Sequence, residues 1–230
     1  MSPESALDAA ALTAVSPWHV PAEVVTEIPS TNDELLCRGE AGAPEGTLLF
    51  AESQTAGRGQ FQRSWSSASG LGLWFSLLLR LDINDSTVPL LSAFPAVSLV
   101  ETLQALGISA GIKAPNDVLI GGRKVAGILV ETRPGRNPFA VIGIGLNVNH
   151  SPKDFPEELK DRATSLALVA GSRFNRTAVA STLIAELRKA EHLMLESPET
   201  LLSAWHGHLL PTQAAKPDQQ SGFNEYEATA

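Results

Sequence analysis

One short polar segment of the chain combines glycine with cationic side chains. Residues 57–65 have the sequence GRGQFQRSW and lie between two apolar runs. Glycine lets the backbone approach a ligand closely, and guanidinium groups bind carboxylate or phosphate with directional hydrogen bonds. We therefore expect a loop that covers a charged ligand, with Arg58 and Arg63 as its cations. The alternative is a solvated connection that binds nothing.

Two lysines lie beside turn signals further along the chain. Lys113 opens the sequence KAPND at 113–117, and Lys124 follows the hairpin signal Gly121-Gly122 within GRKVAGIL at 122–129. A lysine among apolar strand residues can hold its ammonium group half-buried, where it would neutralise an anion. The alternative is a long side chain that extends along the surface into water.

The segment 142–149 has the sequence IGIGLNVN. Glycines at alternate strand positions clear one face of the strand and leave a slot for a flat ligand, beside the Asn147 and Asn149 amides. Close sheet packing without a ligand is the alternative. The segment is not a dinucleotide fingerprint, because it lacks a third glycine and a following helix, and the chain has no Walker-type phosphate loop.

The segment Ser30-Thr31-Asn32 precedes acidic residues that favour a helix start. A helix N-terminus presents free N–H groups, and hydroxyls there can bind a neutral polar group as well as an anion. Cys37 falls within this helix, where a buried, unreactive thiol is the expectation.

The elements that position these segments follow from hydrophobic periodicity and from capping residues. The pattern predicts an α+β fold with a mixed β-sheet and helices packed on one face. Expected strands cover 23–28, 47–51, 73–81, 111–114, 118–120, 124–132 and 139–148. The first expected helix begins at 30 or 31. Three more helices are expected over 89–107, 175–195 and 197–205, with Asn175 and Ser197 as caps and Pro198 at a first helical position. Residues 1–22 are expected to form a loose arm, and residues 211–230 a polar tail.

Composition narrows the classes of function. The chain has 230 residues, 43% of them hydrophobic, and a formal net charge of −8, which argues against a broad nucleic-acid surface. Its one cysteine excludes an internal disulfide and a multi-cysteine metal site. The N-terminus lacks a basic signal region, and no apolar run approaches membrane-spanning length. We therefore expect a cytoplasmic protein that uses neither DNA nor membrane as a partner.

Taken together, these segments resemble the biotin protein ligase family, also called biotin–[acetyl-CoA-carboxylase] ligases. The matching motifs occur in the family's order across about 24–149: STN at 30–32, the glycine-arginine loop ending at Trp65, KAPND, GRKVAGIL and GIGLNVN. The resemblance implies a catalytic domain at 23–210 of the class II aminoacyl-tRNA synthetase-like, biotin/lipoate ligase type. It implies that biotin and Mg·ATP give biotinyl-5′-AMP, and that biotin then passes to a lysine of the biotin carboxyl carrier protein or domain of acetyl-CoA carboxylase.

The same resemblance implies roles for individual residues. Catalytic roles fall to Lys124, Arg58, Arg63 and Lys113. Contacts with biotin fall to Ser30, Thr31, Asn32, Gln54, Gly57, Arg58, Gly59, Gln60, Lys124, Gly127, Gly143 and Gly145. Contacts with ATP fall to Arg63, Trp65, Lys113, Asn116, Asp117 and Asn147. Mg²⁺ would come with ATP, and its protein ligands stay unassigned.

The chain departs from the family pattern in several places. Gln60 replaces the second arginine of the loop, Gln62 replaces a glycine, and Ala114 replaces a tryptophan. We expect the monofunctional form, without the DNA-binding domain and without the family's usual C-terminal β-barrel. The sequence leaves open a lipoate or octanoate ligase or transferase on the same fold, a catalytically impaired biotin-binding protein, and a homodimer.

Overall fold

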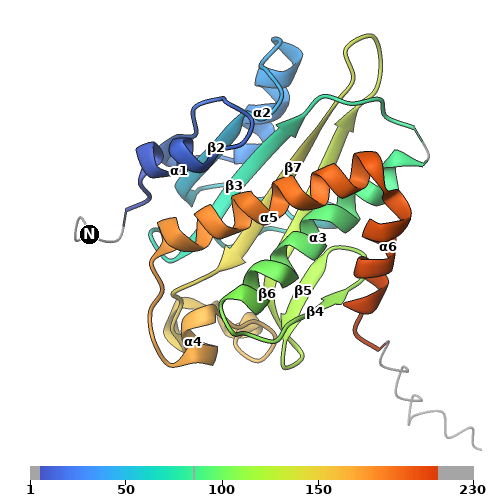
Figure 1. Ribbon diagram of the computed structural model, residues 1–230. Helices are drawn as coiled ribbons and strands as arrows, with labels where there is room; N and C mark the ends of the chain where they lie inside the picture. The colour runs from blue at the N-terminus through green and yellow to red at the C-terminus, as the bar shows by residue number, and fades with distance from the viewer. Residues whose placement is uncertain (1–5, 85, 212–230) are drawn as a thin grey trace, which may run out of the picture.

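A mixed seven-stranded sheet forms the centre of the molecule (Figure 1). The computed structural model describes residues 6–84 and 86–211. The strand order is β1-β2-β3-β7-β6-β5-β4, with β1 and β2 parallel and the other neighbours antiparallel. The strands are β1 (Glu23–Ile28), β2 (Leu48–Gln54), β3 (Gly72–Leu79), β4 (Gly111–Lys113), β5 (Asp117–Ile120), β6 (Arg123–Arg133) and β7 (Phe139–Asn147).

Helices occupy the two faces of the sheet unequally. The helices are α1 (Ala9–Val15), α2 (Thr31–Glu40), α3 (Thr87–Ala105), α4 (Leu166–Ala170), α5 (Arg176–Glu196) and α6 (Pro198–Gly207), with short 3₁₀ turns η2 (Gln60–Gln62), η3 (Pro152–Asp154) and η4 (Glu157–Leu159). The long helices α3 and α5 pack on one face together with α6 (Figure 1). The predicted α+β fold is confirmed, but the helices do not all lie on one face as expected, because α2 packs on the opposite face against β2, β3 and β7.

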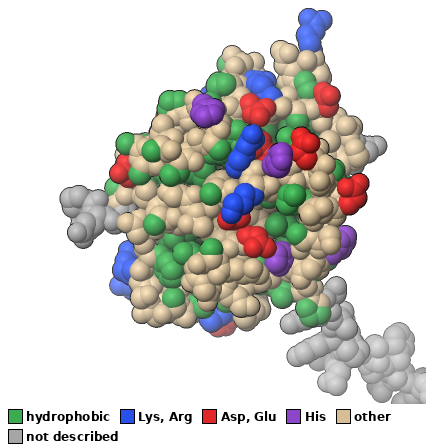
Figure 2. Space-filling view, in the orientation of Figure 1, with side chains coloured by type: hydrophobic (Ala, Val, Ile, Leu, Met, Phe, Trp, Pro, Cys, Tyr) green, Lys and Arg blue, Asp and Glu red, His purple; other side chains and the backbone are tan. Residues whose placement is uncertain are grey.

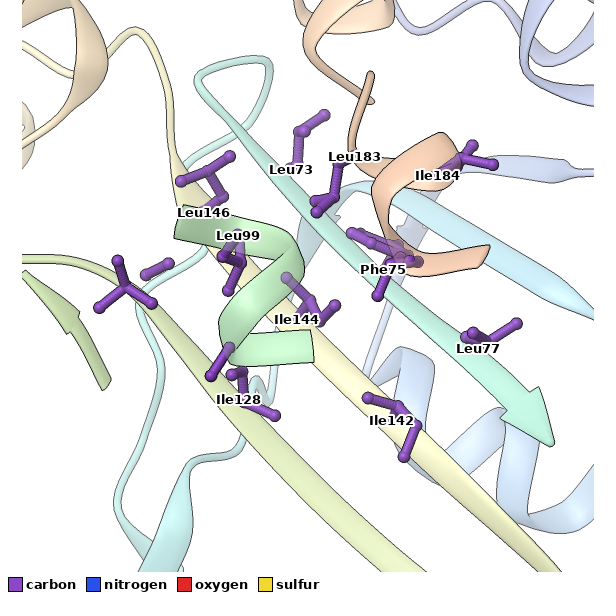
Figure 3. Packing of buried hydrophobic residues seen from close by; sticks show 14 of the residues in the cluster. Leu73, Phe75, Leu77, Leu99, Ile128, Ile142, Ile144, Leu146, Leu183 and Ile184 are labelled. Carbon is purple, nitrogen blue, oxygen red and sulfur yellow. The ribbon is translucent and has the colours of Figure 1, made fainter. Parts of the chain in front are cut away.

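Alternation along β3 and β7 gives the sheet these two different faces. Leu73, Phe75 and Leu77 of β3 point into the main core, as do Ile142 and Ile144 of β7 (Figure 3). Leu99 of α3 and Leu183 and Ile184 of α5 meet them from the helical layer (Figure 3). The intervening residues face α2, where a smaller apolar cluster forms around Leu35, Leu49, Leu78 and Val141. This second cluster holds the start of α2 over the centre of the sheet.

Local sequence signals explain where several elements begin and end. The Ser30 hydroxyl accepts a hydrogen bond from the Asp33 N–H, and the Asn175 side chain accepts one from the Ala178 N–H. Gly121 and Gly122 have φ values of 55° and 79°, as the tight β5–β6 hairpin requires. The expected Ser197 cap is wrong, because its side chain makes no capping hydrogen bond, although Pro198 does begin α6.

The expected loose arm at residues 1–22 is packed onto the domain over its described part, 6–22. Helix α1 contacts α5, and Leu12 is fully buried in the main core. The indole of Trp18 covers Gly46 and donates a hydrogen bond of 3.0 Å to Glu191 Oε2. Alanine-rich helices have little amphipathic contrast, so the sequence did not reveal this one. The expected polar tail lies outside the described residues from 212 onward.

Helix α3 is long and apolar enough to cross a membrane, but 67% of its most apolar window is buried within the fold. Burial of this helix in the hydrophobic core therefore explains its high hydropathy. Figure 2, which views the helix-covered face, shows Lys and Arg side chains interspersed with Asp and Glu. This face carries no single cationic patch.

A buried ion pair ties α5 to the sheet. Arg176 Nη2 lies 2.7 Å from Glu52 Oε2, and both side chains are less than a tenth exposed. Arg176 also donates to the Gly72 carbonyl, and Glu52 Oε1 accepts from the Leu7 N–H. The pair therefore joins β2, β3, α5 and the N-terminal segment at one point.

Neutralising Glu52 should destabilise the domain strongly, because it removes the carboxylate that pairs with the buried Arg176 guanidinium. We expect Glu52→Gln to lower the free energy of unfolding by about 3 kcal/mol, measured by urea denaturation. Glu157→Gln removes one partner of the exposed pair with Lys160 and should cost about 0.5 kcal/mol or less. Equal losses in the two variants would contradict this account.

Candidate functional site

A hollow opens on the face of the sheet that α2 shares. It lies between the start of α2, the end of β2, the segment 58–65 and the glycine positions of β6 and β7. Most of the residues predicted from sequence line it: Ser30, Thr31, Asn32, Gln54, Arg58, Gly59, Gln60, Trp65, Asn116, Lys124, Gly127, Gly143 and Gly145. Gly57 and Arg63 line an adjoining hollow within the loop. The fold thus brings together segments that are far apart in the sequence.

A hydrogen-bonded chain of neutral polar groups forms one end of the hollow. Gln54 Oε1 accepts hydrogen bonds from the Thr31 N–H at 2.9 Å and the Thr31 hydroxyl at 3.2 Å. The Ser76 hydroxyl lies 2.8 Å from Thr31 Oγ1 and 2.6 Å from Asn32 Oδ1. Gln54 Nε2 donates to Ser67 Oγ at 3.0 Å. These side chains are therefore held in fixed orientations before any ligand binds.

The glycines of β6 and β7 make room for side chains of the protein itself. A Cβ atom at Gly143 would lie 2.2 Å from Asn32 Oδ1, and one at Gly145 would lie 2.5 Å from the Trp65 ring. A Cβ at Gly127 would lie 2.8 Å from that ring. The slot predicted from the glycine spacing therefore exists, and Asn32 and Trp65 reach its floor.

A β-bulge aims Lys124 into the hollow. Val118 pairs with Ala126 and Leu119 with Lys124, so β6 has one extra residue at Val125. Val125 and Ala126 both point into the core, which turns Lys124 to the same face as Gly127. Its ammonium group lies 2.6 Å from Asp117 Oδ1 and 5.0 Å from the centre of the Trp65 ring. The cation is thus positioned by a carboxylate and an aromatic face.

Arg58 lies at the mouth of the hollow between two carboxylates. Its Nη2 is 2.6 Å from Asp33 Oδ1 and 2.5 Å from Glu131 Oε2. The loop around it folds back on itself, with the Gly59 N–H bonded to the Arg63 carbonyl at 2.7 Å and the Trp65 N–H to the Gly57 carbonyl at 2.8 Å. Arg58 is therefore held over the hollow by charge as well as by backbone pairing.

Three predicted residues line neither of these two hollows. Lys113 is exposed at the end of β4, and Asp117 contacts the hollow only through Lys124. Asn147 is buried, and its amide donates to the Thr164 carbonyl at 3.0 Å. Asn116 does line the hollow, but its amide donates to the Ile128 carbonyl, which stabilises the turn after β4.

Comparison with known proteins identifies the family. A family model described as "Biotin/lipoate A/B protein ligase family" matches residues 24–149, which is more than half of the chain. The chain belongs to this family. The residues matched include every segment that lines the hollow.

Several relatives of the biotin/lipoate ligase family are similar over most of the domain. The chain is 50% identical over 140 residues to the bifunctional ligase/repressor BirA of Bacillus subtilis, covering 60% of this chain and 43% of that protein. It is 37% identical over 183 residues to the biotin–[acetyl-CoA-carboxylase] ligase of Mycobacterium tuberculosis, covering 72% and 62%. The chain thus spans about half the length of the curated relatives it matches.

Among solved structures, the biotin protein ligase from Aquifex aeolicus in complex with biotin and ATP has a TM-score of 0.70 and 30% identity. The alignment covers 82% of this chain and 78% of that one. The enzyme from Leishmania major, 20% identical with a TM-score of 0.68, supports the fold alone.

The biotin/lipoate ligase domain contains site residues that the sequence analysis missed. Ser76 is fully buried and is the one polar residue of β3, and this break in an apolar strand was a usable signal. Glu131 lies in β6 two residues after the GRKVAGIL motif, and its carboxylate binds both Arg58 and the Asn32 amide. No local sequence pattern indicates these contacts. Cys37, expected to be buried, is exposed on α2.

An aromatic series runs from the hollow to the segment after β7. Trp65 packs edge-on against Trp74 at 6.2 Å between ring centres, and Trp74 against His150 at 5.7 Å. His150 stacks on Phe155 at 5.0 Å and is only 3% exposed. Burial disfavours the imidazolium and lowers the pKa of His150 to about 4.

The stability of the domain should therefore decrease as the pH is lowered, because His150 takes up a proton more readily in the unfolded chain. The unfolded chain binds a proton near pH 6.5 and the folded chain only near pH 4, so this contribution is complete above pH 6.5 and is lost on acidification. We expect a loss of about 2 kcal/mol between pH 7 and pH 5, measured by urea denaturation. His150→Leu should remove that part of the pH dependence, and an unchanged slope would contradict the assignment.

Adding a methyl group at Gly145 should expel the Trp65 ring from the floor of the hollow. We expect Gly145→Ala to shift tryptophan fluorescence to longer wavelength and to cost about 1–3 kcal/mol of stability. Gly207→Ala on α6 is the matched control, because a Cβ there meets nothing within 4 Å. A similar spectrum in the two variants would show that the ring is not confined as described.

Proposed function

We propose that this domain is a biotin protein ligase. In the first step a carboxylate oxygen of biotin attacks the α-phosphorus of ATP, giving biotinyl-5′-AMP and pyrophosphate. In the second step the amine of a carrier lysine attacks the acyl carbon, forms the amide and displaces AMP. Neither step needs a nucleophile from the protein, so the demands on the site are alignment, charge neutralisation and exclusion of water.

The observation that carries the proposal is the polarity of the hollow from end to end. Neutral donors and acceptors at the start of α2 occupy one end, and the Lys124 ammonium group lies at the other, across a floor of glycine and indole. Arg58 lies at the mouth, on the α2 side, between Asp33 and Glu131. A ligand that fits must have a neutral polar head, an apolar middle and an acidic tail. Biotin has this arrangement, and the Aquifex aeolicus relative is described in complex with biotin and ATP.

The cations of the site have distinct tasks in this reaction. Lys124 has an ammonium group next to Gly127, where it would neutralise the biotin carboxylate and the negative charge that develops at the phosphorus. Arg58, held near the mouth, would cover the adenylate once it forms. Trp65 forms a wall that separates the mixed anhydride from water.

Mg²⁺ would enter as a complex with ATP. Within the part of the chain that the structure describes, no group of three or more His, Cys, Asp or Glu side chains forms a metal cluster. Mg²⁺ commonly binds through one or two carboxylates together with substrate phosphates, and Asp117 is the carboxylate nearest to Lys124. We propose the carrier domain of a biotin-dependent carboxylase as the acceptor. A homodimer and a cytoplasmic location stay predictions.

ATP–pyrophosphate exchange tests the first step. We expect exchange that depends on biotin and not on lipoate or octanoate, followed by transfer of biotin to a carrier domain. Lys124→Met should lower the exchange rate by about 10²–10³-fold, because it removes a charge that acts in the transition state. Lys189→Met, on the exposed side of α5, is the control.

The outcomes of this assay separate the candidate functions. Exchange with lipoate alone would assign the domain to the lipoate branch of the family. Biotin binding without exchange would identify a catalytically impaired binding protein.

Gln60 should weaken retention of the adenylate, since a neutral amide lines the hollow where the family pattern has an arginine. We expect Gln60→Arg to slow the release of biotinyl-5′-AMP about tenfold, the effect of about 1.4 kcal/mol from one added charge-assisted contact. Gln60→Met, of similar length and without charge, is the control. Stopped-flow dissociation rates that match in the two variants would contradict the prediction.

A further inference from the structure

The Asn32 carboxamide is held from both sides by other groups of the protein. Its Nδ2 donates to Glu131 Oε2 at 3.0 Å and to the Leu129 carbonyl at 3.3 Å. Its Oδ1 lies 2.6 Å from the Ser76 hydroxyl. Asn32 itself is only 4% exposed, so the amide has little freedom to exchange these partners for water.

These contacts allow only one orientation of the amide. Turned by 180°, Oδ1 would face the Glu131 carboxylate and the Leu129 carbonyl, and three acceptors would meet without a proton between them. In the observed orientation both N–H groups of Asn32 are engaged, and Oδ1 keeps one lone pair. Asn32 can therefore accept a hydrogen bond from a ligand but cannot donate one.

The neighbouring groups have the opposite capacity. Ser30 Oγ accepts from the Asp33 N–H, which leaves the Ser30 hydroxyl proton available to a ligand. Gln54 Nε2 bonds to Ser67 with one of its two protons. This end of the hollow thus presents one acceptor beside donors, which complements a ligand with an N–H group next to a carbonyl. A cyclic urea has this pattern, whereas a dithiolane ring or an alkyl chain does not.

We propose that Ser76 and Glu131 are positioning residues that set the site's preference for a ureido ring, by fixing the Asn32 amide as an acceptor. The proposal rests on the proposed function and extends it to two residues behind the site. Neither residue lines the hollow: Ser76 is fully buried, and Glu131 lies behind Asn32. Because a site with unpaired buried polar groups discriminates strongly, these two residues can control selectivity without touching the ligand.

The test compares biotin with its two cyclic carbamate analogues, in which one or the other ureido N–H is replaced by oxygen. The purified chain is titrated with each ligand by calorimetry. We expect the unmodified protein to bind biotin at least 100-fold more tightly than the analogue lacking the N–H that faces Asn32. Glu131→Met should reduce that ratio at least tenfold, because the amide loses its charged acceptor and can rotate and donate to the ring oxygen. Ser76→Ala should reduce the ratio less, because both acceptors of Asn32 Nδ2 stay in place.

Two further variants separate amide orientation from other effects. Glu131→Gln keeps an oxygen acceptor for Asn32 but removes the charge that binds Arg58, so it should retain the selectivity ratio. Asp33→Asn removes the other carboxylate on Arg58 without contacting the Asn32 amide, and it should also retain the ratio. A merely structural role would instead weaken all ligands by one factor and leave every ratio unchanged, which would overturn the proposal.

Binding of these ligands to the unmodified protein separates the proposed ligase function from the positioning role of Ser76 and Glu131. Biotin binding with no preference over either carbamate would overturn the role of Ser76 and Glu131 and leave the ligase function standing. Absence of biotin binding would overturn the proposed function, and this inference with it.

Discussion

The site depends on strand β7 having one continuous apolar face and, at Gly143 and Gly145, a stretch of the other face without side chains. Ile142, Ile144 and Leu146 are bulky and buried under α3 and α5, and the intervening Gly143 and Gly145 present bare backbone. The register pairs Gly143 with Ser76 of β3, and Gly145 with Gly127 of β6. The cleared strip therefore extends across neighbouring strands, which a single glycine could not achieve.

The side chains that form the floor of the hollow lie against this glycine strip. Asn32 can reach the sheet because Gly143 has no Cβ, and Trp65 can lie flat because Gly145 and Gly127 have none. The opposite face must then supply nearly all of the apolar burial, which explains why α3 is so apolar and so deeply buried. The face covered by α3 and α5 therefore provides the stable core, and the face that α2 shares can hold the polar groups of the site.

The sequence predicted the parts of this arrangement that local chemistry determines. Capping by Ser30 and Asn175, the Gly121-Gly122 hairpin and the glycine strip all follow from single residues or short spacings. Residues that act through long-range pairing were not foreseen. Strict alternation would place Val125, rather than Lys124, on the face of Gly127, and only the bulge against β5 reverses this. Glu131 became a site residue because the pairing of β6 with β7 carries it behind Asn32.

Charge in this acidic chain is organised so that the two cations that line the hollow, Arg58 and Lys124, each have an anionic partner. Arg58 pairs with Asp33 and Glu131, and Lys124 pairs with Asp117. A substrate carboxylate or phosphate would therefore exchange one anion for another, and no bare ammonium or guanidinium has to be stabilised in its absence. Such an exchange costs less free energy than desolvating an unpaired cation. It favours ligands whose negative charge can take the place of the protein carboxylate that the cation gives up. Glu131 is special in this scheme, because the carboxylate that releases Arg58 still holds Asn32. The polar end of the hollow therefore keeps its orientation when Arg58 changes its anionic partner.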